Sequence, residues 1–307
     1  MHIISRREFL GMGLLALAAT PALGNLSLPM AKKKGKMEVS LAEWSIHVEL
    51  EKKLVDHLDF PKIAREEFGI GVIEPVSSFF KDRSTTYLNE VKKRASDYGV
   101  RHNLIMVGGN GLGLMDDKKR QAQVDDHCAW VDTAKYLGCK AIRVNPWGEG
   151  TADQVAGHLM ESYATLSEYA AKEKMYVLVE NHREYSADAD WLMHIIKQVN
   201  NPYLGTLPDF GNFCLRSNKD GCIEEYDRYE GVKRMLPLAK ALSAKTYDFD
   251  SNGYETTIDY PRMFQILKDF GYSGTIGIEY EGWRLPAYEA IRASKKLIDN
   301  LIKQYDF

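Results

Sequence analysis

The segment Tyr176-Val177-Leu178-Val179-Glu180-Asn181-His182 decides how this sequence is interpreted. Its first four residues form the short apolar run that is typical of a strand buried on both faces. A charged residue is tolerated in such a strand only at an end, where solvent or a ligand meets it. The position of Glu180 therefore predicts that a parallel strand has its carboxyl end here and that the Glu180 side chain lies at a functional site.

Two further strands have the same design. Leu204-Gly205-Thr206-Leu207-Pro208 leads into Asp209, and Thr275-Ile276-Gly277-Ile278 leads into Glu279-Tyr280-Glu281. The 29 residues from Glu180 to Asp209 and the 70 from Asp209 to Glu279 correspond to about one and two strand–helix units of roughly 30 residues or more. We therefore expect the three acids to converge on one rim.

From Met37 onward, β-rich runs alternate with longer helical segments, as in parallel strands joined by helices. The predicted strands end near Trp44, Glu74, Val107, Asn145, Glu180, Asp209, Asp248 and Glu279. The predicted helices cover 56–68, 84–98, 117–137, 152–173, 187–199, 224–240, 259–270 and 286–304. Eight strands favour an α/β fold, a single (β/α)8 TIM barrel over residues 37–307. The alternative, an open doubly wound sheet, would need a glycine-rich loop after its first strand, and Trp44-Ser45-Ile46-His47-Val48 has no glycine.

Composition and charge exclude several function classes. The 307 residues are 45% hydrophobic and 27% charged, which is ordinary for a globular protein. A net charge of -3 without a basic stripe argues against nucleic acid as a partner. The four cysteines show neither a CxxC pair nor zinc-site spacing. Buried, chemically idle thiols are the simplest interpretation, and a Cys214–Cys222 disulfide is the alternative in an oxidising compartment.

The first thirty residues have the features of an export signal. Ser5-Arg6-Arg7-Glu8-Phe9-Leu10-Gly11 precedes an apolar run from Met12 to Leu23, and together they resemble a twin-arginine leader. The run is too short for a membrane span, which takes about 20 apolar residues. We expect a signal peptide over 1–30, a linker over 31–36, an exported or periplasmic location, and no membrane segment in the mature chain.

Three carboxylates at one rim imply a cation. They raise one another's pKa unless a positive charge or shared protons offset the repulsion. Oxygen ligands favour Mn²⁺ or Mg²⁺ as that cation, with Zn²⁺ or Co²⁺ as alternatives. The predicted metal ligands are therefore Glu180, Asp209 and Glu279. The competing interpretation is that each acid caps a helix or pairs with Arg or Lys.

Three short motifs carry a resemblance to a known family. They are Val179-Glu180-Asn181-His182, Pro208-Asp209-Phe210-Gly211-Asn212-Phe213 and Ile278-Glu279-Tyr280-Glu281-Gly282. Through them, residues 37–304 resemble the xylose isomerase-like sugar isomerases and epimerases, which include tagatose epimerases, inosose dehydratases and hydroxypyruvate isomerases. In that family Glu, Asp, His and Glu from strands five to eight hold the metal. Where relatives read His-x-Lys-Asp, this sequence has Ser243-Ala244-Lys245-Thr246.

The resemblance implies a mechanism. Glu180 and Glu279 would flank the substrate carbon and exchange a proton, while the metal stabilises the enediolate. His182 and Lys245 are the other catalytic candidates. With Ser243 in the histidine's place, the site would bind metal more weakly, use His182 or water to complete the metal shell, or have lost metal altogether.

Residues at the other strand ends are candidates for substrate binding, since aromatic faces pack against sugar C–H groups and polar side chains bind hydroxyls. They are Trp44, Glu74, His102, Asn145, Trp147, Asn181, Asn212 and Glu281.

The expected function is a metal-dependent isomerase or epimerase that abstracts a proton next to a carbonyl of an unphosphorylated sugar, keto-sugar or polyol. One alternative is a lyase or dehydratase that acts on a keto-sugar or inosose at the same site. The others are a non-catalytic sugar-binding barrel and a metal-dependent phosphodiesterase resembling endonuclease IV. The sequence is also compatible with a homo-oligomer.

Overall fold

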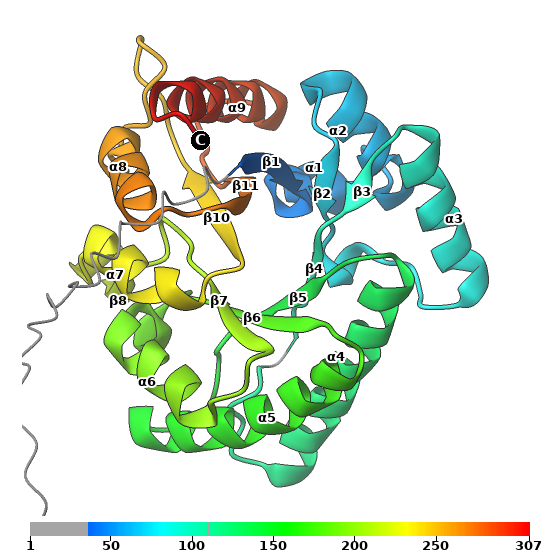
Figure 1. Ribbon diagram of the computed structural model, residues 1–307, viewed down its shortest axis with the longest axis vertical. Helices are drawn as coiled ribbons and strands as arrows, with labels where there is room; N and C mark the ends of the chain where they lie inside the picture. The colour runs from blue at the N-terminus through cyan, green and yellow to red at the C-terminus, as the bar shows by residue number, and fades with distance from the viewer. Residues whose placement is uncertain (1–35, 110) are drawn as a thin grey trace, which may run out of the picture. The chain divides into compact units, whose positions relative to one another are not determined.

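The computed structural model describes residues 36–109 and 111–307, in which helices surround a ring of strands (Figure 1). The predicted signal peptide over 1–30 and nearly all of the linker lie outside the described residues. The barrel strands are β1 (Met37–Ala42), β2 (Val72–Glu74), β3 (Arg101–His102), β4 (Leu104–Met106), β5 (Ala141–Val144), β6 (Tyr176–Glu180), β7 (Leu204–Leu207), β10 (Ala241–Thr246) and β11 (Gly274–Tyr280).

All neighbouring barrel strands are parallel. One sheet has the order β10-β11-β1-β2-β3 and the other has the order β4-β5-β6-β7. Asn103 joins them, because its backbone N–H donates to Ile73 at 2.9 Å and its carbonyl accepts from Lys140 at 3.1 Å. At the other seam, the Ser243 N–H donates to Pro208 at 3.0 Å and the Phe210 N–H donates to Ser243 at 3.1 Å. These bonds close the barrel, so β3 and β4 together act as its third strand.

The helices follow the strands as predicted, with ends that differ by a few residues. They are α1 (His47–Glu51), α2 (Phe60–Phe68), α3 (Thr85–Asp97), α4 (Asp117–Tyr136), α5 (Ala152–Lys172), α6 (Ala189–Val199), α7 (Arg228–Met235), α8 (Tyr260–Phe270) and α9 (Ala287–Gln304). Short 3-10 helices are η1 (Glu43–Ile46), η2 (His57–Asp59), η3 (Ser77–Phe79), η4 (Glu184–Ala187) and η5 (Leu236–Leu238). Within the described residues, no helix is long and apolar enough to cross a membrane.

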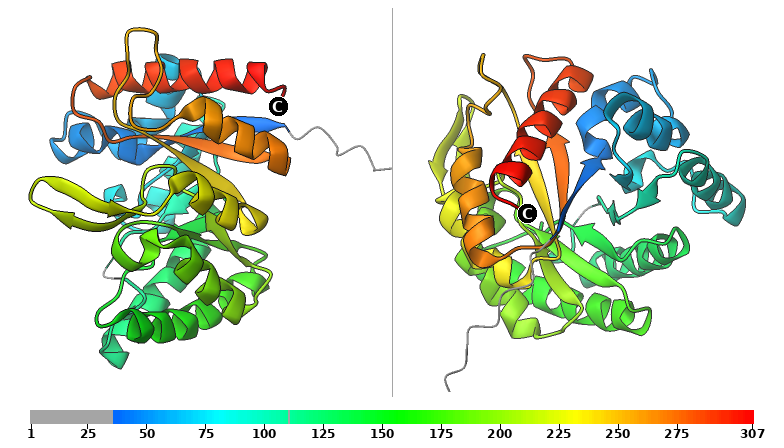
Figure 2. Two further views of the ribbon diagram at one scale, coloured as in Figure 1. Left: turned by 90° about the vertical axis from the view of Figure 1, so that its left-hand side faces the viewer. Right: turned by 45° about the horizontal axis from the view of Figure 1, so that its top comes forward.

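Two predicted boundaries are wrong. Trp44 lies in η1 rather than at the end of β1, which stops at Ala42. The helix predicted over 224–240 begins only at Arg228, because an antiparallel hairpin, β8 (Cys214–Asn218) and β9 (Gly221–Glu225), precedes it. This hairpin extends from the side of the barrel on which the strands end (Figure 2).

The hairpin also corrects the interpretation of the cysteines. Cys214 and Cys222 form a disulfide with Cα atoms 5.8 Å apart. Cys128 and Cys139 are free thiols, and Cys139 is buried. Two of the four cysteines are therefore a covalent tie across the hairpin instead of idle thiols.

The side chains that face into the barrel change character along its axis. A small apolar cluster of Leu104, Met106, Ala141, Leu178, Leu207 and Ala241, together with its neighbours, fills part of the interior. Glu74 also points inward, and a Cβ atom on Gly277 would lie only 2.6 Å from its Oε2 atom. Glycine at 277 therefore makes room for a carboxyl group inside the barrel. The larger apolar core lies between the strands and the surrounding helices.

Candidate functional site

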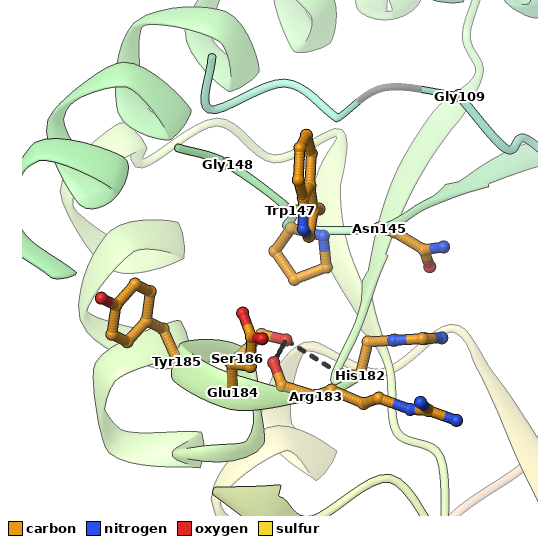
Figure 3. Close-up of a pocket in the computed structure, with 10 residues that line it drawn as sticks. Gly109, Asn145, Trp147, Gly148, His182, Arg183, Glu184, Tyr185 and Ser186 are labelled. Atoms are coloured by element: carbon orange, nitrogen blue, oxygen red, sulfur yellow. Dashed lines mark hydrogen bonds between the residues drawn. The ribbon is translucent and has the colours of Figure 1, made fainter. Parts of the chain in front are cut away.

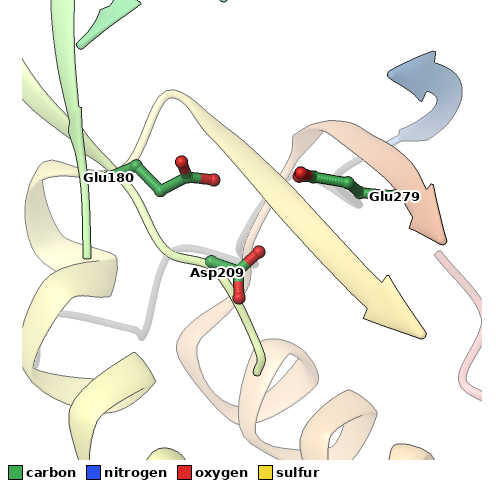
Figure 4. Close-up of side chains that lie close together, drawn as sticks. All are labelled: Glu180, Asp209 and Glu279. Carbon is green, nitrogen blue, oxygen red and sulfur yellow. The ribbon is translucent and has the colours of Figure 1, made fainter. Parts of the chain in front are cut away.

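The three predicted acids meet at the carboxyl ends of β6, β7 and β11. One carboxylate oxygen from each of Glu180, Asp209 and Glu279 lies within 4.8 Å of the other two, and all three residues are buried. Their side chains point toward a common centre (Figure 4). The alternation of side chains along a strand turns these residues to the barrel interior. The predicted convergence is therefore confirmed as geometry.

Lys245 supplies positive charge to this cluster. It lies on β10 between the acids, with Nζ 3.0 Å from Glu279 Oε1 and 3.6 Å from Asp209 Oδ2. The same ammonium is 3.1 Å from Glu281 Oε2. The indole Nε1 of Trp44 donates to the other oxygen of Glu281 at 2.6 Å. Lys245 thus contacts Asp209, Glu279 and Glu281, and Trp44 fixes the position of Glu281.

Ser243 lies between two of the acids. Its Oγ atom is 2.6 Å from Asp209 Oδ2 and 2.7 Å from Glu279 Oε2. A hydroxyl has one proton, so it donates to one carboxylate, and the other contact needs a proton on the acid or a cation bound to both oxygens. Asp209 Oδ1 accepts from the N–H groups of Gly211 at 2.7 Å and Asn212 at 2.8 Å, which fixes the carboxylate in this orientation.

Glu180 is the least satisfied of the acids. Arg143 Nε is 3.3 Å from its Oε2 atom, but the geometry is not that of a hydrogen bond. The other oxygen, Oε1, is buried and has no hydrogen-bond partner among the described residues. Buried polar atoms in native proteins are nearly always paired, so an unpaired carboxylate oxygen indicates a place for an ion, water or substrate.

The environments of the acids push their pKa values apart. Burial raises the pKa of Glu180 well above its usual value, and Arg143 only partly offsets this. Burial also raises the pKa of Asp209, to about 6, against the opposing effect of Lys245. For Glu279 the balance is reversed, because burial is outweighed by Lys245, Arg143 and Ser243, and its pKa is lowered. The protein itself thus keeps Glu279 ionised and favours a proton on Glu180.

The surroundings of Lys245 and His182 also set their charge states. Burial alone would lower the pKa of Lys245, but Asp209, Glu279, Glu281 and Glu180 raise it well above its usual value. Burial lowers the pKa of His182 to about 4, and the positive charges of Arg143 and Lys245 act in the same direction. Lys245 is therefore a cation and His182 a neutral imidazole near pH 7.

Two adjoining cavities lie beside the strand ends that carry the acids, and Glu180, Asp209 and Glu279 themselves line neither of them. The smaller, of about 410 Å³, is lined by Asn145, Trp147, His182 and their neighbours. Trp147 and Asn145 lie on one side of this cavity, and His182 and Arg183 lie on the other (Figure 3). The larger, of about 890 Å³, is lined by Asn212, Glu281 and residues of the hairpin. Both cavities include His182, Arg183 and Glu184 in their walls.

The chain matches the family model described as "Xylose isomerase-like TIM barrel" over residues 63–301. The chain belongs to the xylose isomerase-like TIM barrel family. None of the curated proteins matches it.

Solved structures with the same fold include a zinc-bound protein and two sugar epimerases. An IOLI protein with a bound zinc atom superposes with a TM-score of 0.66 at 18% identity, covering 88% of this chain and 99% of that one. The 3-keto-D-glucoside 4-epimerase YcjR from E. coli gives 0.67 at 16% identity, covering 86% and 100%. An L-ribulose 3-epimerase gives 0.68 at 13%, covering 88% and 96%. At these identities the likeness shows the shared fold.

Two solved structures with this fold hold a metal: the IOLI protein binds a zinc atom, and a xylose isomerase-like TIM barrel protein from Mycobacterium smegmatis is in complex with magnesium. The residues of this chain fit such an ion. Oxygens on opposite sides of an octahedral Mg²⁺ lie about 4.2 Å apart, so small side-chain rotations would bring the three acids into range. The unpaired Glu180 Oε1 and the Ser243 hydroxyl offer further oxygen ligands. The donors are all oxygen, which suits a hard ion.

Three of the residues predicted to bind substrate line neither of the two cavities. His102 pairs in register with Ile73, which faces the outer core, and it lines a small space with Pro75 and Val91 beneath the helices. Asn181 is buried, and its amide bonds to the backbones of Asp209 and Asn212, which holds β6 and β7 together.

Glu74 is the third of these residues. It accepts hydrogen bonds from Ser40 at 2.7 Å and Asn103 at 2.9 Å inside the barrel. It packs against Gly277, two residues before Glu279, so it lies deeper than the rim. His102, Asn181 and Glu74 are therefore corrected to structural positions.

The sequence-based prediction also missed residues of the site. Arg143 points to Glu180 from the middle of β5, where a charged residue in Ala141-Ile142-Arg143-Val144 breaks the apolar pattern. That break was a usable signal, because a barrel strand buries both faces. Trp283 and Arg228 line the larger cavity from loops and helix starts, where no sequence pattern points to them.

Proposed function

We propose that this protein is a metal-dependent sugar isomerase or epimerase that abstracts a proton next to a carbonyl. The observation that carries the proposal is the triad of Glu180, Asp209 and Glu279, with their oxygens within 4.8 Å of one another at the strand ends. Membership of a family whose solved relatives include sugar epimerases supports the same reaction class. The substrate is an unphosphorylated sugar, keto-sugar or polyol.

The two glutamates take opposite roles in proton transfer. Glu279, kept ionised by Lys245 and Arg143, accepts the proton from the substrate carbon. Glu180, which lies across the triad from Glu279, returns a proton to the opposite face of the same carbon. The carbon loses one proton and gains one, so its configuration inverts and atoms balance. Paired acids with separated pKa values are the usual basis for such a division.

Three other residues orient the reaction. Lys245 donates to Glu279 and Glu281 and keeps the base in place. Asp209, Glu180 and Glu279 would hold the divalent ion, with the Ser243 hydroxyl in the place of the family histidine. When bound, that ion supplies Lewis-acid stabilisation for negative charge on the substrate oxygen.

The proposal is tested by deuterium exchange. The purified protein, loaded with Mn²⁺ or Mg²⁺ and analysed for metal, is incubated in D₂O with a panel of sugars, 3-keto-sugars and polyols, and NMR detects the labelled carbon. We expect one deuterium at one carbon, lost when a chelator removes the ion. If no compound exchanges in the metal-loaded protein, the proton-transfer mechanism is wrong.

We also propose that the chain is exported. The twin-arginine-like residues near the start support this, and so does the exposed hairpin disulfide Cys214–Cys222, since disulfides persist mainly in oxidising compartments. Fractionation of the source cells, with Arg6→Lys and Arg7→Lys together as the matched control, tests it. Retention of the unaltered chain in the cytoplasm would contradict the proposal.

A further inference from the structure

We infer that the larger cavity is a subsite for the second sugar unit of a glycoside, so that the substrate has two rings rather than one. The inference rests on the proposed function for the reacting ring. The two cavities adjoin, because His182, Arg183 and Glu184 line both, and a two-ring ligand would occupy one cavity with each ring. A volume of about 890 Å³ in the larger one is at the upper end of sites that enclose drug-sized molecules, far more than one hexose needs.

The wall of this subsite is the β8–β9 hairpin, which the barrel itself does not require. Leu215, Ser217 and Asn218 line the cavity along with both cysteines of the disulfide. At the base of the hairpin, the Tyr226 N–H donates to the Phe213 carbonyl at 2.9 Å and the two rings stack. A wall closed at its base, with a disulfide from the start of β8 to the second residue of β9, keeps its shape when a ligand enters.

An unpaired donor marks the chemistry of the ligand. Arg228, at the start of α7, lines the cavity, and its Nη1 atom is buried without a hydrogen-bond partner among the described residues. Its Nη2 atom pairs with Glu225 Oε1, so the positive charge is already compensated. Arg284, another cavity residue, is likewise paired with Asp248 at 2.8 Å. The charge of Arg228 and of Arg284 is compensated, and the spare N–H group of Arg228 suits a neutral acceptor such as a sugar hydroxyl.

An exposed aromatic face completes the subsite. Trp283 lines the same cavity and is 84% exposed, an unusual position for a large apolar side chain without a ligand. Trp147, 47% exposed, lines the smaller cavity. A tryptophan in each cavity offers one face to each of two rings.

The backbone holds Trp283 beside the catalytic residues. A Cβ atom on Gly282 would lie 1.7 Å from the Tyr247 carbonyl oxygen, so only glycine lets the two segments pass this closely. On either side of Gly282, Glu281 reaches Lys245 and Trp283 lines the cavity. The reacting ring and the second ring are thus bound by neighbouring residues of one short segment.

Calorimetry on the full chain with matched ligands tests this inference. The pairs are glucose with cellobiose and glucose with maltose, each also in its 3-keto form. We expect at least one disaccharide to bind tenfold or more tightly than its monosaccharide. Trp283→Ala and Arg228→Gln should each reduce that advantage to less than threefold. Ile223→Ala, a 53% exposed hairpin residue that does not line the cavity, should keep it.

Each other outcome is decisive. The subsite is refuted if no disaccharide binds more tightly than its monosaccharide, or if the advantage survives both substitutions. Trp283→Ala removes an exposed side chain and leaves the fold intact, so a loss there reports on binding. A disaccharide advantage without deuterium exchange would keep the subsite and overturn the proposed reaction. Deuterium exchange on monosaccharides, without tighter binding of any disaccharide, would keep the proposed reaction and refute the subsite.

Discussion

Glu74 and Glu279 are two buried acids in the same barrel, yet their surroundings differ in kind. Glu74 is bonded to neutral partners, Ser40 and Asn103, and burial raises its pKa. Glu279 contacts the Lys245 ammonium at 3.0 Å, and its pKa is lowered despite equal burial. Burial alone therefore does not identify a functional acid. The charge of the partners separates a structural carboxyl group from one kept ionised for chemistry.

The largest expected effect on deuterium exchange comes from replacing Glu279, the acid with charged partners. Glu279→Gln removes the proton acceptor but keeps the shape, so deuterium exchange should fall by about 10²- to 10⁴-fold, the usual range for a general base. Exchange rates in D₂O measure this for the substrate found in the panel. A loss below tenfold would remove Glu279 from the mechanism and erase the contrast with Glu74.

Lys245→Met should have the next largest effect, because it takes away the cation that lowers the pKa of Glu279. An acid whose pKa rises needs a higher pH to ionise, so the acidic limb of the pH–rate profile should move to higher pH. Stability should fall by about 3 to 5 kcal/mol, as for other broken buried pairs. Urea unfolding and a pH–rate profile check both, and an unmoved limb would contradict the role given to Lys245.

Metal binding should depend on pH through Asp209 and Glu180. Burial raises the pKa of both acids, that of Asp209 to about 6, so each gains a proton as pH falls, and the proton then competes with the metal. At about 100-fold excess over Kd, Mn²⁺ should stabilise the protein by about 2.7 kcal/mol at pH 7.5. That corresponds to a Tm increase of roughly 5 to 10 °C. Calorimetry should find a much smaller increase at pH 5, and equal increases would refute the Asp209 contact.

The smallest effect is expected at the acid with neutral partners. In Glu74→Gln the amide oxygen can still accept from Ser40 and Asn103, so exchange should stay within about threefold of the unchanged chain. The raised pKa means that ionisation of Glu74 costs stability as pH rises, a cost the glutamine lacks. The variant should match or exceed the original in Tm at pH 8, with the difference vanishing at low pH. A large loss of exchange would move Glu74 into the site.

The sequence predicted the acids well because strand ends and alternation are local properties. Glu180, Asp209 and Glu279 each end a readable apolar run, and parallel strands bring such ends to one rim. Lys245 was found through the family motif. The same local rule would have found Arg143, a charged residue in the middle of β5.

Other features depend on information that local patterns lack. His102 belongs to a two-residue strand beside the irregularity at Asn103, and a one-residue slip turns a side chain to the opposite face. Trp44 and Glu281 lie 237 residues apart, so their bond depends on barrel closure. The hairpin did leave a signal, the Asp220-Gly221 pair between two short runs, but the predicted elements leave residues 214–223 unassigned and begin a helix at 224.

The β8–β9 hairpin has a consequence for how tolerant the site is of change. It is inserted between the strand that leads to Asp209 and helix α7, and it carries its own covalent tie. Mutations within it can therefore accumulate without moving the acids. The wall of the larger cavity can thus change while the three carboxylates stay in place.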